Sequence, residues 1–260
     1  MRVDLDGRVL LVTGSTQGVG LAIALEAARS GASAVLLTGR DAARGAAALE
    51  QLQGLGVEAQ FVAADLADPE QPSRLFEAGL ARFGRIDCLV NAAGLTDRAS
   101  VLNATAPIFD RLFATNVRAP FFLLQRFVAH LRDKGRGGSA VNILSMNVYG
   151  GTPDLAVYSA SKAALATLTK NAAHTHRFDR IRINGINMGW ADTPAERNMQ
   201  GVVLGGGEAW LERAAQAQPF GRLLGADDVA RLAVFLLSDA SMPMTGALVD
   251  QEQWVMGPKD

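Results

Sequence analysis

The chain has 260 residues, of which 49% are hydrophobic and 20% are charged, and its formal net charge is −1. This length and composition are typical of a globular protein with a sizeable core, and the small net charge gives no reason to expect nucleic acid or an anionic membrane as a partner. The single cysteine, Cys88, lies in an apolar run, which indicates a buried structural thiol and excludes an internal disulfide. Because neither a secretion signal nor a membrane-spanning apolar run is visible, we expect a cytoplasmic location.

Apolar, β-branched runs alternate with helical patterns along the chain. The predicted strands cover residues 8–13, 34–38, 58–63, 86–90, 140–144, 181–187 and 247–250. The predicted helices cover residues 21–30, 41–53, 69–83, 107–132 with a break near 115–120, 155–177 and 227–238. This alternation predicts an α/β fold, a Rossmann-type doubly wound sheet of seven parallel strands with helices on both faces. No linker or repeat interrupts it, so we expect a single domain over residues 1–260.

A glycine-rich turn joins the first predicted strand to the first predicted helix. It contains Gly14, Gly18 and Gly20, and the Ala- and Leu-rich helical pattern behind it ends at Gly31. Glycine lets the backbone approach a phosphate closely, and the amino end of a helix favours an anion. The turn therefore predicts a dinucleotide-phosphate site, although a tight turn without a ligand can have the same pattern.

Ser145, Tyr158 and Lys162 form a candidate acid/base site. Ser145 follows a predicted strand, and Tyr158 and Lys162 stand four residues apart on the next helix, side by side on one face. A neighbouring cation favours the ionised form of a phenol, so Tyr158 could move a proton on an alcohol or a carbonyl. Five residues fall at or just after strand ends: Gly14, Asp65, Asn91, Ser145 and Gly189. Because doubly wound sheets bind ligands at these ends, we expect the acid/base group beside the dinucleotide.

These motifs, in this order, resemble the short-chain dehydrogenase/reductase family over essentially the whole chain. The matching elements are TGxxxGxG at residues 13–20, Asn-Ala-Ala-Gly at residues 91–94, Asn116 within Thr-Asn-Val, Ser145, and Tyr158 and Lys162 within YSASK. The resemblance implies an NAD(P)-dependent oxidoreductase that interconverts a secondary alcohol and a ketone by hydride transfer.

The resemblance also implies a role for each catalytic residue. Tyr158 would be the general acid in reduction and the base in oxidation, and Ser145 would polarise the substrate oxygen. Lys162 would lower the pKa of the phenol and hydrogen-bond the nicotinamide ribose. Asn116 would hold a water that relays protons to Lys162, although a helix-bending core residue is the simpler interpretation of this asparagine.

The cofactor site that the resemblance implies draws on residues from most strand ends. Its members are Gly14, Ser15, Gln17, Gly18, Val19, Gly20, Arg40, Asp65, Leu66, Asn91, Ala92, Ala93, Gly94, Tyr158, Lys162, Gly189 and Thr193. Asp65 resembles the residue that hydrogen-bonds the adenine, with a role as the N-cap of the next helix as the alternative. Thr193 resembles the threonine that contacts the carboxamide.

The end of the second strand bears on the choice of cofactor. An acid there would bind the ribose 2′-hydroxyl of NAD(H), but Gly39 stands in its place and Arg40 follows. Arg40 could pair with a 2′-phosphate, helped by the Ser15 hydroxyl. Gln17 replaces the other basic residue of the family, and Asp41 is nearby, although Asp41 is more simply a helix N-cap. We favour NADP(H) and leave NAD(H) open.

Three positions depart from the family pattern. Ala92 replaces an asparagine and is expected to alter a structural hydrogen bond, and Met188 replaces a proline that would fix the backbone angle φ. Asp-Gln-Glu at residues 250–252 replaces Asp-Gly-Gly, so the C-terminal tail is expected to take another path. None of these changes removes a catalytic group.

Three segments are expected to choose the substrate: residues 95–103, 146–154 and 190–218. The last contains three consecutive glycines at 205–207, which we interpret as the hinge of a lid over the site. Apolar candidates for the substrate wall are Met146, Tyr149, Trp190 and Met199, and polar candidates are Thr96, Asn147 and Asp154. This mixture leaves a sugar or polyol and a small cyclic ketone both open.

Two rival functions remain open at this stage. A ketoacyl-thioester (3-oxoacyl carrier protein) reductase would need a basic surface for an acidic carrier protein, which Arg126, Arg132, Lys134 and Arg136 could form. A dinucleotide-binding sensor without turnover is the second, but it would have no need of Tyr158.

We expect no metal site, because His174 and His176 are two residues apart on a helix and face different sides. The family resemblance implies a homo-oligomer, a tetramer or a dimer, with an interface formed by the helices at 107–132 and 155–177. Small alanine side chains on the second of these helices would permit close packing.

Overall fold

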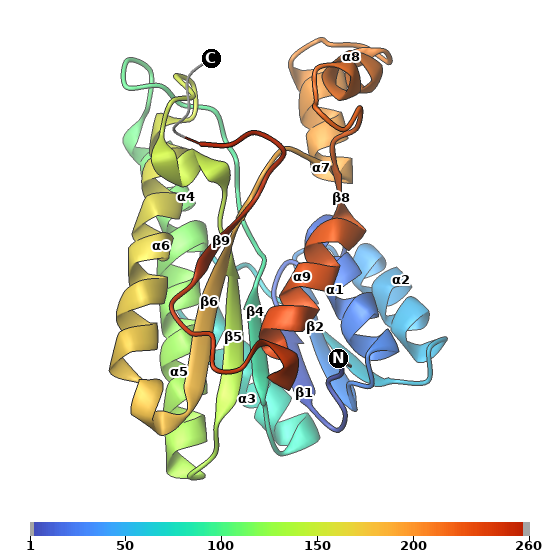
Figure 1. The fold of residues 1–260 in the computed structure, drawn as a ribbon, viewed down its shortest axis with the longest axis vertical. Helices are drawn as coiled ribbons and strands as arrows, with labels where there is room; N and C mark the ends of the chain where they lie inside the picture. Colours follow the sequence, from blue (N-terminus) through green and yellow to red (C-terminus); the bar gives the residue numbers. More distant parts are fainter. Residues whose placement is uncertain (1–2, 257–260) are drawn as a thin grey trace.

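The computed structural model describes residues 3–256 and shows a parallel sheet between two layers of helices (Figure 1). The strand order is β3-β2-β1-β4-β5-β6-β9, and all neighbouring strands are parallel. The strands are β1 (Val9–Val12), β2 (Ala34–Gly39), β3 (Glu58–Ala63), β4 (Cys88–Asn91), β5 (Gly138–Ile143), β6 (Ile181–Met188) and β9 (Leu248–Gln251). The predicted seven-stranded, doubly wound sheet is confirmed.

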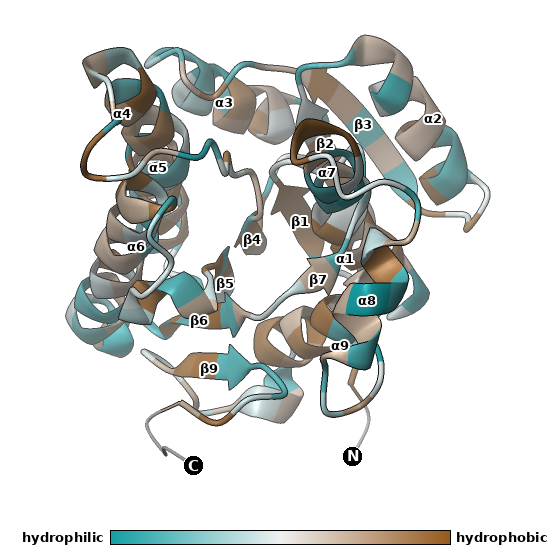
Figure 2. Ribbon diagram, turned by 90° about the horizontal axis from the view of Figure 1, so that it is seen from above, coloured by the Kyte–Doolittle hydropathy of each residue, from teal (hydrophilic) through white to brown (hydrophobic). Residues whose placement is uncertain are grey.

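Helices cover both faces of this sheet, as the view from above shows (Figure 2). The main helices are α1 (Gly18–Arg29), α2 (Ala42–Gln53), α3 (Gln71–Phe83), α4 (Ala106–Phe113), α5 (Ala119–Asp133), α6 (Ala156–Thr175) and α9 (Ala226–Leu237). Side chains of α1, α2 and α9 form one core with the sheet, and those of α3, α5 and α6 form the other. None of the helices within residues 3–256 has the length and apolar character needed to span a membrane.

Strand β1 shows why the central strands read as unbroken apolar runs. Leu10 and Val12 belong to the core under α1 and α9, whereas Leu11 belongs to the core under α3 and α5. All three side chains are fully buried. Neighbouring residues of a strand point to opposite faces, and here both faces are covered, so no position needs a polar residue.

The crossover between β1 and β4 places the ligand site. The chain leaves β1 for β2 and β3, and then returns to the other side of β1 to form β4. The connections at the carboxyl ends of β1 and β4 therefore diverge and leave a crevice between them. The glycine-rich turn after β1 and residues 92–94 after β4 lie at this crevice.

The break predicted near residues 115–120 is a π-helical turn, Ala114–Arg118, between α4 and α5. The helical path continues through it, and Pro120 lies in the first turn of α5, where its missing N–H costs little. Such turns are frequent at functional sites, because the extra residue displaces side chains from the regular helical positions. Asn116 lies in this turn.

The segment after β6 contains elements that the sequence pattern did not predict. Beyond the sheet lie α7 (Pro194–Arg197), a π-helical stretch (Asn198–Val203) and α8 (Trp210–Gln216) (Figure 1). Two short strands, β7 (Ala191–Asp192) and β8 (Leu224–Gly225), pair at the base of this segment. Trp210, Ala214 and Leu223 give it a small core of its own. The segment is thus a packed unit attached to the sheet by its two ends.

Cys88 and the histidines lie away from the site. Cys88 is fully buried in β4, and burial raises the pKa of its thiol to about 11, which confirms a structural thiol. The His176 ring pairs with Asp179 at 2.8 Å. Within residues 3–256, no group of three or more His, Cys, Asp and Glu side chains could hold a metal ion.

Candidate functional site

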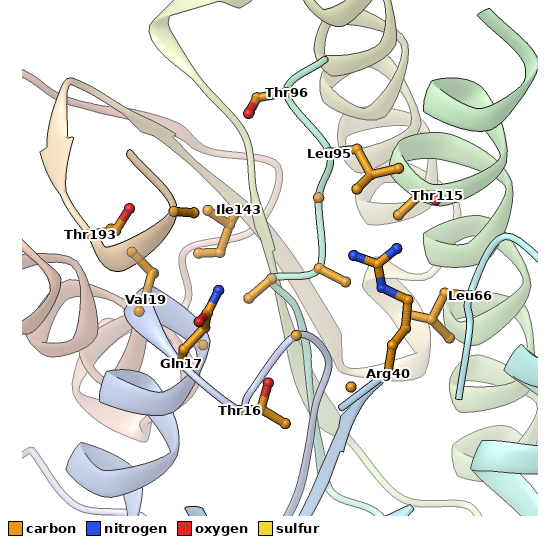
Figure 3. A pocket seen from close by; sticks show the side chains of 18 of the residues that line it. Thr16, Gln17, Val19, Arg40, Leu66, Leu95, Thr96, Thr115, Ile143 and Thr193 are labelled. Atoms are coloured by element: carbon orange, nitrogen blue, oxygen red, sulfur yellow. The ribbon is translucent and has the colours of Figure 1, made fainter. Parts of the chain in front are cut away.

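A cavity of about 740 Å³ lies in the crevice at the carboxyl ends of the strands (Figure 3). Most of the residues expected to bind a cofactor line it: Gly14, Gln17, Gly18, Val19, Gly20, Arg40, Asp65, Leu66, Ala92, Ala93, Gly94, Tyr158, Lys162 and Thr193. Three expected residues, Ser15, Asn91 and Gly189, do not line it. The cavity size is within the usual range for a small-molecule or cofactor site, roughly 300–1,000 Å³.

The glycine-rich turn packs against the chain after β4. Gly14 has a φ of 62°, and a Cβ at this position would lie 2.7 Å from the Cα atom of Ala93. A Cβ at Gly20 would collide with the carbonyl oxygen of Gly14. Only glycine fits both positions. Helix α1 begins at Gly18, which lines the cavity, so the N–H groups of its first turn can bind an anion. This geometry fits the pyrophosphate of a dinucleotide.

Thr13 links the glycine-rich turn after β1 to the chain after β4 through hydrogen bonds. Its hydroxyl accepts hydrogen bonds from the backbone N–H groups of Ala92 and Ala93, at 3.0 Å each, and donates to the carbonyl of Val90. The backbone at the unusual Ala92 is therefore held by a side chain from the neighbouring strand. The cavity wall after β4 does not depend on an asparagine at this position.

Two of the expected cofactor ligands, Asn91 and Gly189, have other roles. The buried Asn91 amide donates to the side-chain oxygen of Asn142 at 2.8 Å and so links β4 to β5. Gly189 donates its N–H to the carbonyl of Gln251, and a Cβ there would collide with the Glu252 carboxylate. Gly189 thus packs against the C-terminal segment, while Met188 lines the cavity.

The alternative role of Asp65, as the N-cap of the next helix, is wrong. Its carboxylate accepts a hydrogen bond from the N–H of Ala67 at 3.0 Å, but α3 begins only at Gln71 with Glu70 as its N-cap residue. Asp65 therefore stabilises a turn at the cavity rim and lines the cavity.

Two arginines line the cavity between the end of β2 and the first turn of α2, and the sequence pattern indicated only Arg40. Arg40 projects into the cavity (Figure 3) and has no ion pair within residues 3–256. Arg44, in the first turn of α2, also lines the cavity and donates to the side-chain oxygen of Gln17 at 2.7 Å. Asp41 is the N-cap of α2, as expected, and accepts from the N–H of Arg44.

The expected help of Ser15 in binding a 2′-phosphate is wrong. The Ser15 side chain is fully buried, donates to the carbonyl of Val12 at 2.7 Å, and accepts from the N–H of Thr38 at 3.0 Å. Its neighbour Thr16 lines the cavity instead. A Cβ at Gly39 would lie 2.7 Å from the methyl group of Thr16, so an acidic side chain at position 39 would require Thr16 to move.

Tyr158 lies in the first turn of α6 and lines the cavity, and only 6% of its surface is exposed. Burial raises the pKa of its phenol above the ordinary value; a hydrogen bond with Ser145 opposes this, and the Glu196 charge adds to it. The expected lowering of this pKa is therefore not found in the structure. The phenol is protonated at neutral pH and can donate a proton.

Lys162 lies beside Tyr158, as the spacing predicted, but its ammonium group does not bind the phenol oxygen. The Nζ atom donates to the carbonyl of Ile143 at 2.7 Å and lies 5.8 Å from the centre of the Tyr158 ring. Burial lowers the pKa of Lys162 to about 8, because a low-dielectric environment disfavours its charged form. Lys162 is thus a cation at neutral pH and becomes neutral under mildly alkaline conditions.

Asn116 holds the chain after β4 against α6. Its amide donates to the carbonyl of Leu95 and to the hydroxyl of Ser161, at 3.0 Å each, and its oxygen accepts from the N–H of Leu95 at 2.9 Å. Neither Asn116 nor Ser145 lines the cavity directly. Ser145 caps the short helix Met146–Tyr149 by accepting from the N–H of Asn147. The water-holding role of Asn116 stays a prediction.

The segment after β6 brings a carboxylate towards Tyr158. Thr193 lines the cavity and caps α7 by accepting from the N–H of Glu196 at 3.2 Å. The Glu196 carboxylate accepts from the Trp190 indole at 2.8 Å and from the Gln200 amide at 2.7 Å. Trp190 in turn lies 6.3 Å from Trp210, ring centre to ring centre. The first helix of the segment is therefore connected to both the cavity and α8.

Comparison with known proteins places this geometry among dehydrogenases. A family model described as enoyl-(acyl carrier protein) reductase matches residues 14–251. The chain is 32% identical over 248 residues to the short-chain dehydrogenase/reductase FrzI of Cladobotryum sp, covering 94% of this chain and 93% of that protein. It is also 32% identical over 246 residues to the NADP-dependent (R)-specific alcohol dehydrogenase of Lentilactobacillus kefiri, covering 94% of both chains.

Among solved structures, the chain is similar to L-sorbose reductase from Gluconobacter frateurii, determined in complex with NADPH and L-sorbose. The TM-score is 0.93, the sequence identity is 28%, and the similarity covers 100% of both chains. The similarity therefore includes the segment that contains α7 and α8.

Proposed function

Because the chain belongs to the short-chain dehydrogenase/reductase family, we propose that it reduces a small, polyhydroxylated ketone with NADPH, with Tyr158 as the proton donor. It is an NAD(P)-dependent oxidoreductase acting on alcohols and ketones. The observation that carries the finer proposal is a buried, protonated phenol next to a buried ammonium group in the cofactor cavity.

When bound, the cofactor supplies or accepts the hydride, and the residues of this chain handle the proton. The Tyr158 hydroxyl donates its proton to the carbonyl oxygen of the substrate, and the Ser145 hydroxyl orients that oxygen. The Lys162 ammonium group stabilises the negative charge that develops on Tyr158 as the proton leaves. Burial raises the pKa of Tyr158, so the phenol keeps the proton that reduction of a ketone requires.

The proposed preference for NADP(H) rests on the cationic end of the cavity. Arg40 and Arg44 line it together with Thr16, and no carboxylate occupies position 39. Arginine forms strong, charge-assisted hydrogen bonds with phosphate, whereas the ribose hydroxyl of NAD(H) needs an acceptor. Asp41 is the nearest acid, and its carboxylate is already engaged by the N–H and the guanidinium group of Arg44.

Replacing both arginines (Arg40→Ala with Arg44→Ala) is expected to raise the KM for NADPH by about 10- to 100-fold and to leave the KM for NADH within a few-fold. The reason is that only NADPH carries the phosphate these groups would bind. Steady-state kinetics with each cofactor provides the measurement, and Arg29→Ala, on the exposed end of α1, is the matched control. Equal losses with both cofactors would contradict the proposed role.

The proposed substrate class rests on polar groups near Tyr158. Asn147 donates to Ser145 through its backbone N–H and accepts from the Thr152 hydroxyl at 2.7 Å, and Ser145 in turn hydrogen-bonds Tyr158. The Glu196 carboxylate is close enough to Tyr158 for its charge to affect the phenol. Such groups favour a ketone that carries hydroxyls over an apolar cyclic ketone. The neighbour crystallised with L-sorbose supports the same class.

The test is an absorbance assay with NADPH and NADH over ketoses, polyols, cyclic ketones and ketoacyl thioesters. Reduction of ketoses with the highest kcat/KM supports the proposal. A preference for cyclic ketones would contradict the substrate class, and tight NADPH binding without any turnover would support a sensor instead.

The structure offers little to a ketoacyl carrier protein. Arg126, Arg132, Lys134 and Arg136 lie along the second half of α5 and just beyond it. This helix runs back from the carboxyl ends of the strands, where Tyr158 lies, so its last turn is roughly 20 Å away. Arg132 and Lys134 also already form ion pairs with Asp179 and Asp133. We therefore favour a free small molecule as the substrate.

We also propose that the chain forms a homo-oligomer through α5 and α6. A groove of about 360 Å³ runs between these helices, and we name it the α5–α6 groove. Apolar side chains line it, among them Phe121, Leu124 and Leu168, and Phe121 is 42% exposed. A monomer seldom leaves such a face in contact with water.

Phe121→Glu is expected to shift the protein from a dimer or tetramer towards the monomer, because it buries a charge in the α5–α6 groove. Light scattering coupled to gel filtration gives the mass. Leu55→Glu replaces a comparably exposed side chain elsewhere and should leave the mass unchanged. A wild-type protein that is monomeric at micromolar concentration would refute the proposal.

Two further parts of the proposal concern organisation and location. We propose that residues 190–218 act as a lid that closes over the substrate, with α7 as the part that contacts the cavity. The single domain over residues 1–260 and the cytoplasmic location stay predictions from the sequence.

A further inference from the structure

A second cavity, of about 470 Å³, lies at the amino ends of the strands, whereas the cofactor cavity lies at their carboxyl ends. We name it the arginine cavity. Its charged lining residues are Arg8, Arg85, Arg136, Arg177, Arg180, Arg182, Asp87 and Asp239. Six guanidinium groups against two carboxylates leave an excess of four positive charges, in a chain whose formal net charge is −1. The mechanism proposed above uses none of these residues.

The topology of the sheet brings these arginines together. Arg8 directly precedes β1, Arg85 lies just before β4, Arg136 just before β5, and Arg180 directly precedes β6. The strands β1, β4, β5 and β6 are consecutive neighbours in the sheet, and all are parallel. Their amino ends therefore meet at one edge, and four basic residues that are far apart in the sequence line one cavity.

Two arginines, Arg8 and Arg182, form the floor of the arginine cavity, and both already have hydrogen-bond partners in the protein. Arg182 is 8% exposed and donates to the carbonyls of Leu236, Leu237 and Ser238 at the end of α9. Arg8 pairs with Asp239 beside the same helix end. Cations at a helix carboxyl end are stabilised by its dipole, so these two arginines need no ligand.

Three other arginines form the rim of the arginine cavity. Their guanidinium groups have fewer partners than those of Arg8 and Arg182. Arg136, Arg177 and Arg180 are exposed. Arg136 reaches Asp87 at 3.4 Å, but Arg85 already holds that carboxylate through two hydrogen bonds. Arg177 and Arg180 donate to the neutral carbonyls of His174 and Gly135, and neither forms an ion pair within residues 3–256.

The backbone at Arg180 adds a second observation. Its φ of 60° is the only positive value for a residue other than glycine within the described chain. This left-handed conformation costs a side-chain-bearing residue free energy that glycine would avoid. Arg180 ends the short helix Arg177–Asp179 in this conformation, and its guanidinium donates to the carbonyl of Gly135 at 3.1 Å. The strained position thus carries a rim cation.

We propose that the arginine cavity binds a small anion that carries two or more phosphate groups. Guanidinium groups match phosphate oxygens with paired hydrogen bonds, and three of them on one rim can surround such a group. The excess of four charges and the size of the cavity both exceed what a single phosphate group needs. An anion held by both Arg136 and Arg180 links the amino ends of β5 and β6. Its binding therefore stabilises the folded sheet and does not change the proton transfer at Tyr158.

Pyrophosphate serves as the probe, and isothermal titration calorimetry measures its binding to the full chain. The rim variants separate this site from the phosphate cradle of the cofactor cavity, because none of the rim arginines lines that cavity. Wild-type protein is expected to bind pyrophosphate, and a rise in salt from 50 to 200 mM should weaken the binding at least tenfold, because phosphate contacts are strongly screened. The double variant Arg136→Gln with Arg180→Gln should bind at least tenfold more weakly than wild type.

The matched control is Arg29→Gln, at the carboxyl end of α1 on the same edge of the molecule but outside the arginine cavity. It should bind pyrophosphate as wild type does. Thermal melts of each variant without ligand test whether the fold is retained, and Arg177→Gln provides an independent rim variant if the double variant is unstable.

Absence of pyrophosphate binding at millimolar concentration would overturn the proposal, and so would equal affinity in wild type and the rim variants. Citrate, as a tricarboxylate, forms a separate arm, and binding as tight as that of pyrophosphate would overturn the assignment to phosphates. The comparison between rim variants and Arg29→Gln does not depend on the ketone reductase activity, so it is informative even if that proposal fails.

Discussion

Tyr158→Phe is expected to lower kcat/KM for ketone reduction by roughly 10³-fold or more, while NADPH binding stays within a few-fold of wild type. The change removes only the hydroxyl that would donate the proton. The ring is 6% exposed, and phenylalanine fills the same space, so the fold should be retained. Steady-state kinetics measures the first quantity, and quenching of protein fluorescence by NADPH measures the second.

Tyr149→Phe is the matched control, since the chain has only two tyrosines. Its hydroxyl donates to the Asp250 carboxylate at 3.1 Å and lies in a segment expected to contact the substrate. This control should change kcat/KM less than tenfold. If Tyr158→Phe retained wild-type turnover, the proton donor would have to be another group and the mechanism would be wrong.

Lys162→Met is expected to lower kcat/KM by about 100-fold, because it removes the cation that stabilises the developing phenolate and keeps an unbranched side chain one atom shorter. In the wild type, the pKa of Lys162 is lowered to about 8, so the ammonium form predominates below that pH. Reduction rates of the wild type should therefore decline as the pH rises through about 8. The residual activity of Lys162→Met should not show this decline, and pH–rate profiles of both proteins test it.

The same lowered pKa predicts a change in the free energy of unfolding. Lys162 has a pKa of about 8 in the folded protein and an ordinary value of 10.5 when unfolded, so between these values the unfolded chain binds more protons. Its contribution to stability consequently rises with pH from about 8 towards 10.5 and is lost as the pH falls through 8. Denaturant unfolding at pH 7 and pH 10 should show wild type gaining stability relative to Lys162→Met. Parallel changes in both proteins would contradict the burial of a charged Lys162.

The sheet was predictable because its signals are local. Every predicted strand of the main sheet begins and ends within two residues of the observed one, and the predicted strand at 58–63 has the observed bounds of β3. Strands that are covered on both faces need continuous apolar runs, which are visible in a short window of sequence. The start of α2 is also a local signal, because its N-cap residue Asp41 bonds the N–H of Arg44 three residues later.

The elements after β6 were missed for an equally physical reason. Helices as short as α7 and α8 are not stable by themselves, so no strong periodic pattern marks them. They form because Trp210 packs with Ala214 and Leu223, and because β7 pairs with β8 more than thirty residues later. These contacts join residues that are far apart in the sequence, so a local sequence pattern cannot reveal them.

Side-chain direction explains the corrections within the site. Ser15 and Thr16 are neighbours in the same turn, and the pattern could not tell which hydroxyl faces the cavity. In the fold, the Ser15 hydroxyl bonds the ends of β1 and β2, and Thr16 takes the place at the cavity. Arg44 was missed because its approach to Gln17 depends on how α2 packs against the glycine-rich turn.

By itself, the sequence determined the alternating α/β order, the glycine-rich turn, and the spacing of Tyr158 and Lys162, since each depends on residues within one or two turns of each other. Only the tertiary structure decided the raised pKa of Tyr158, the bond from Lys162 to Ile143, and the arginine cavity. Burial and charge depend on groups that the fold brings together, and Arg8 and Arg180 meet at one edge because β1 and β6 belong to one parallel sheet.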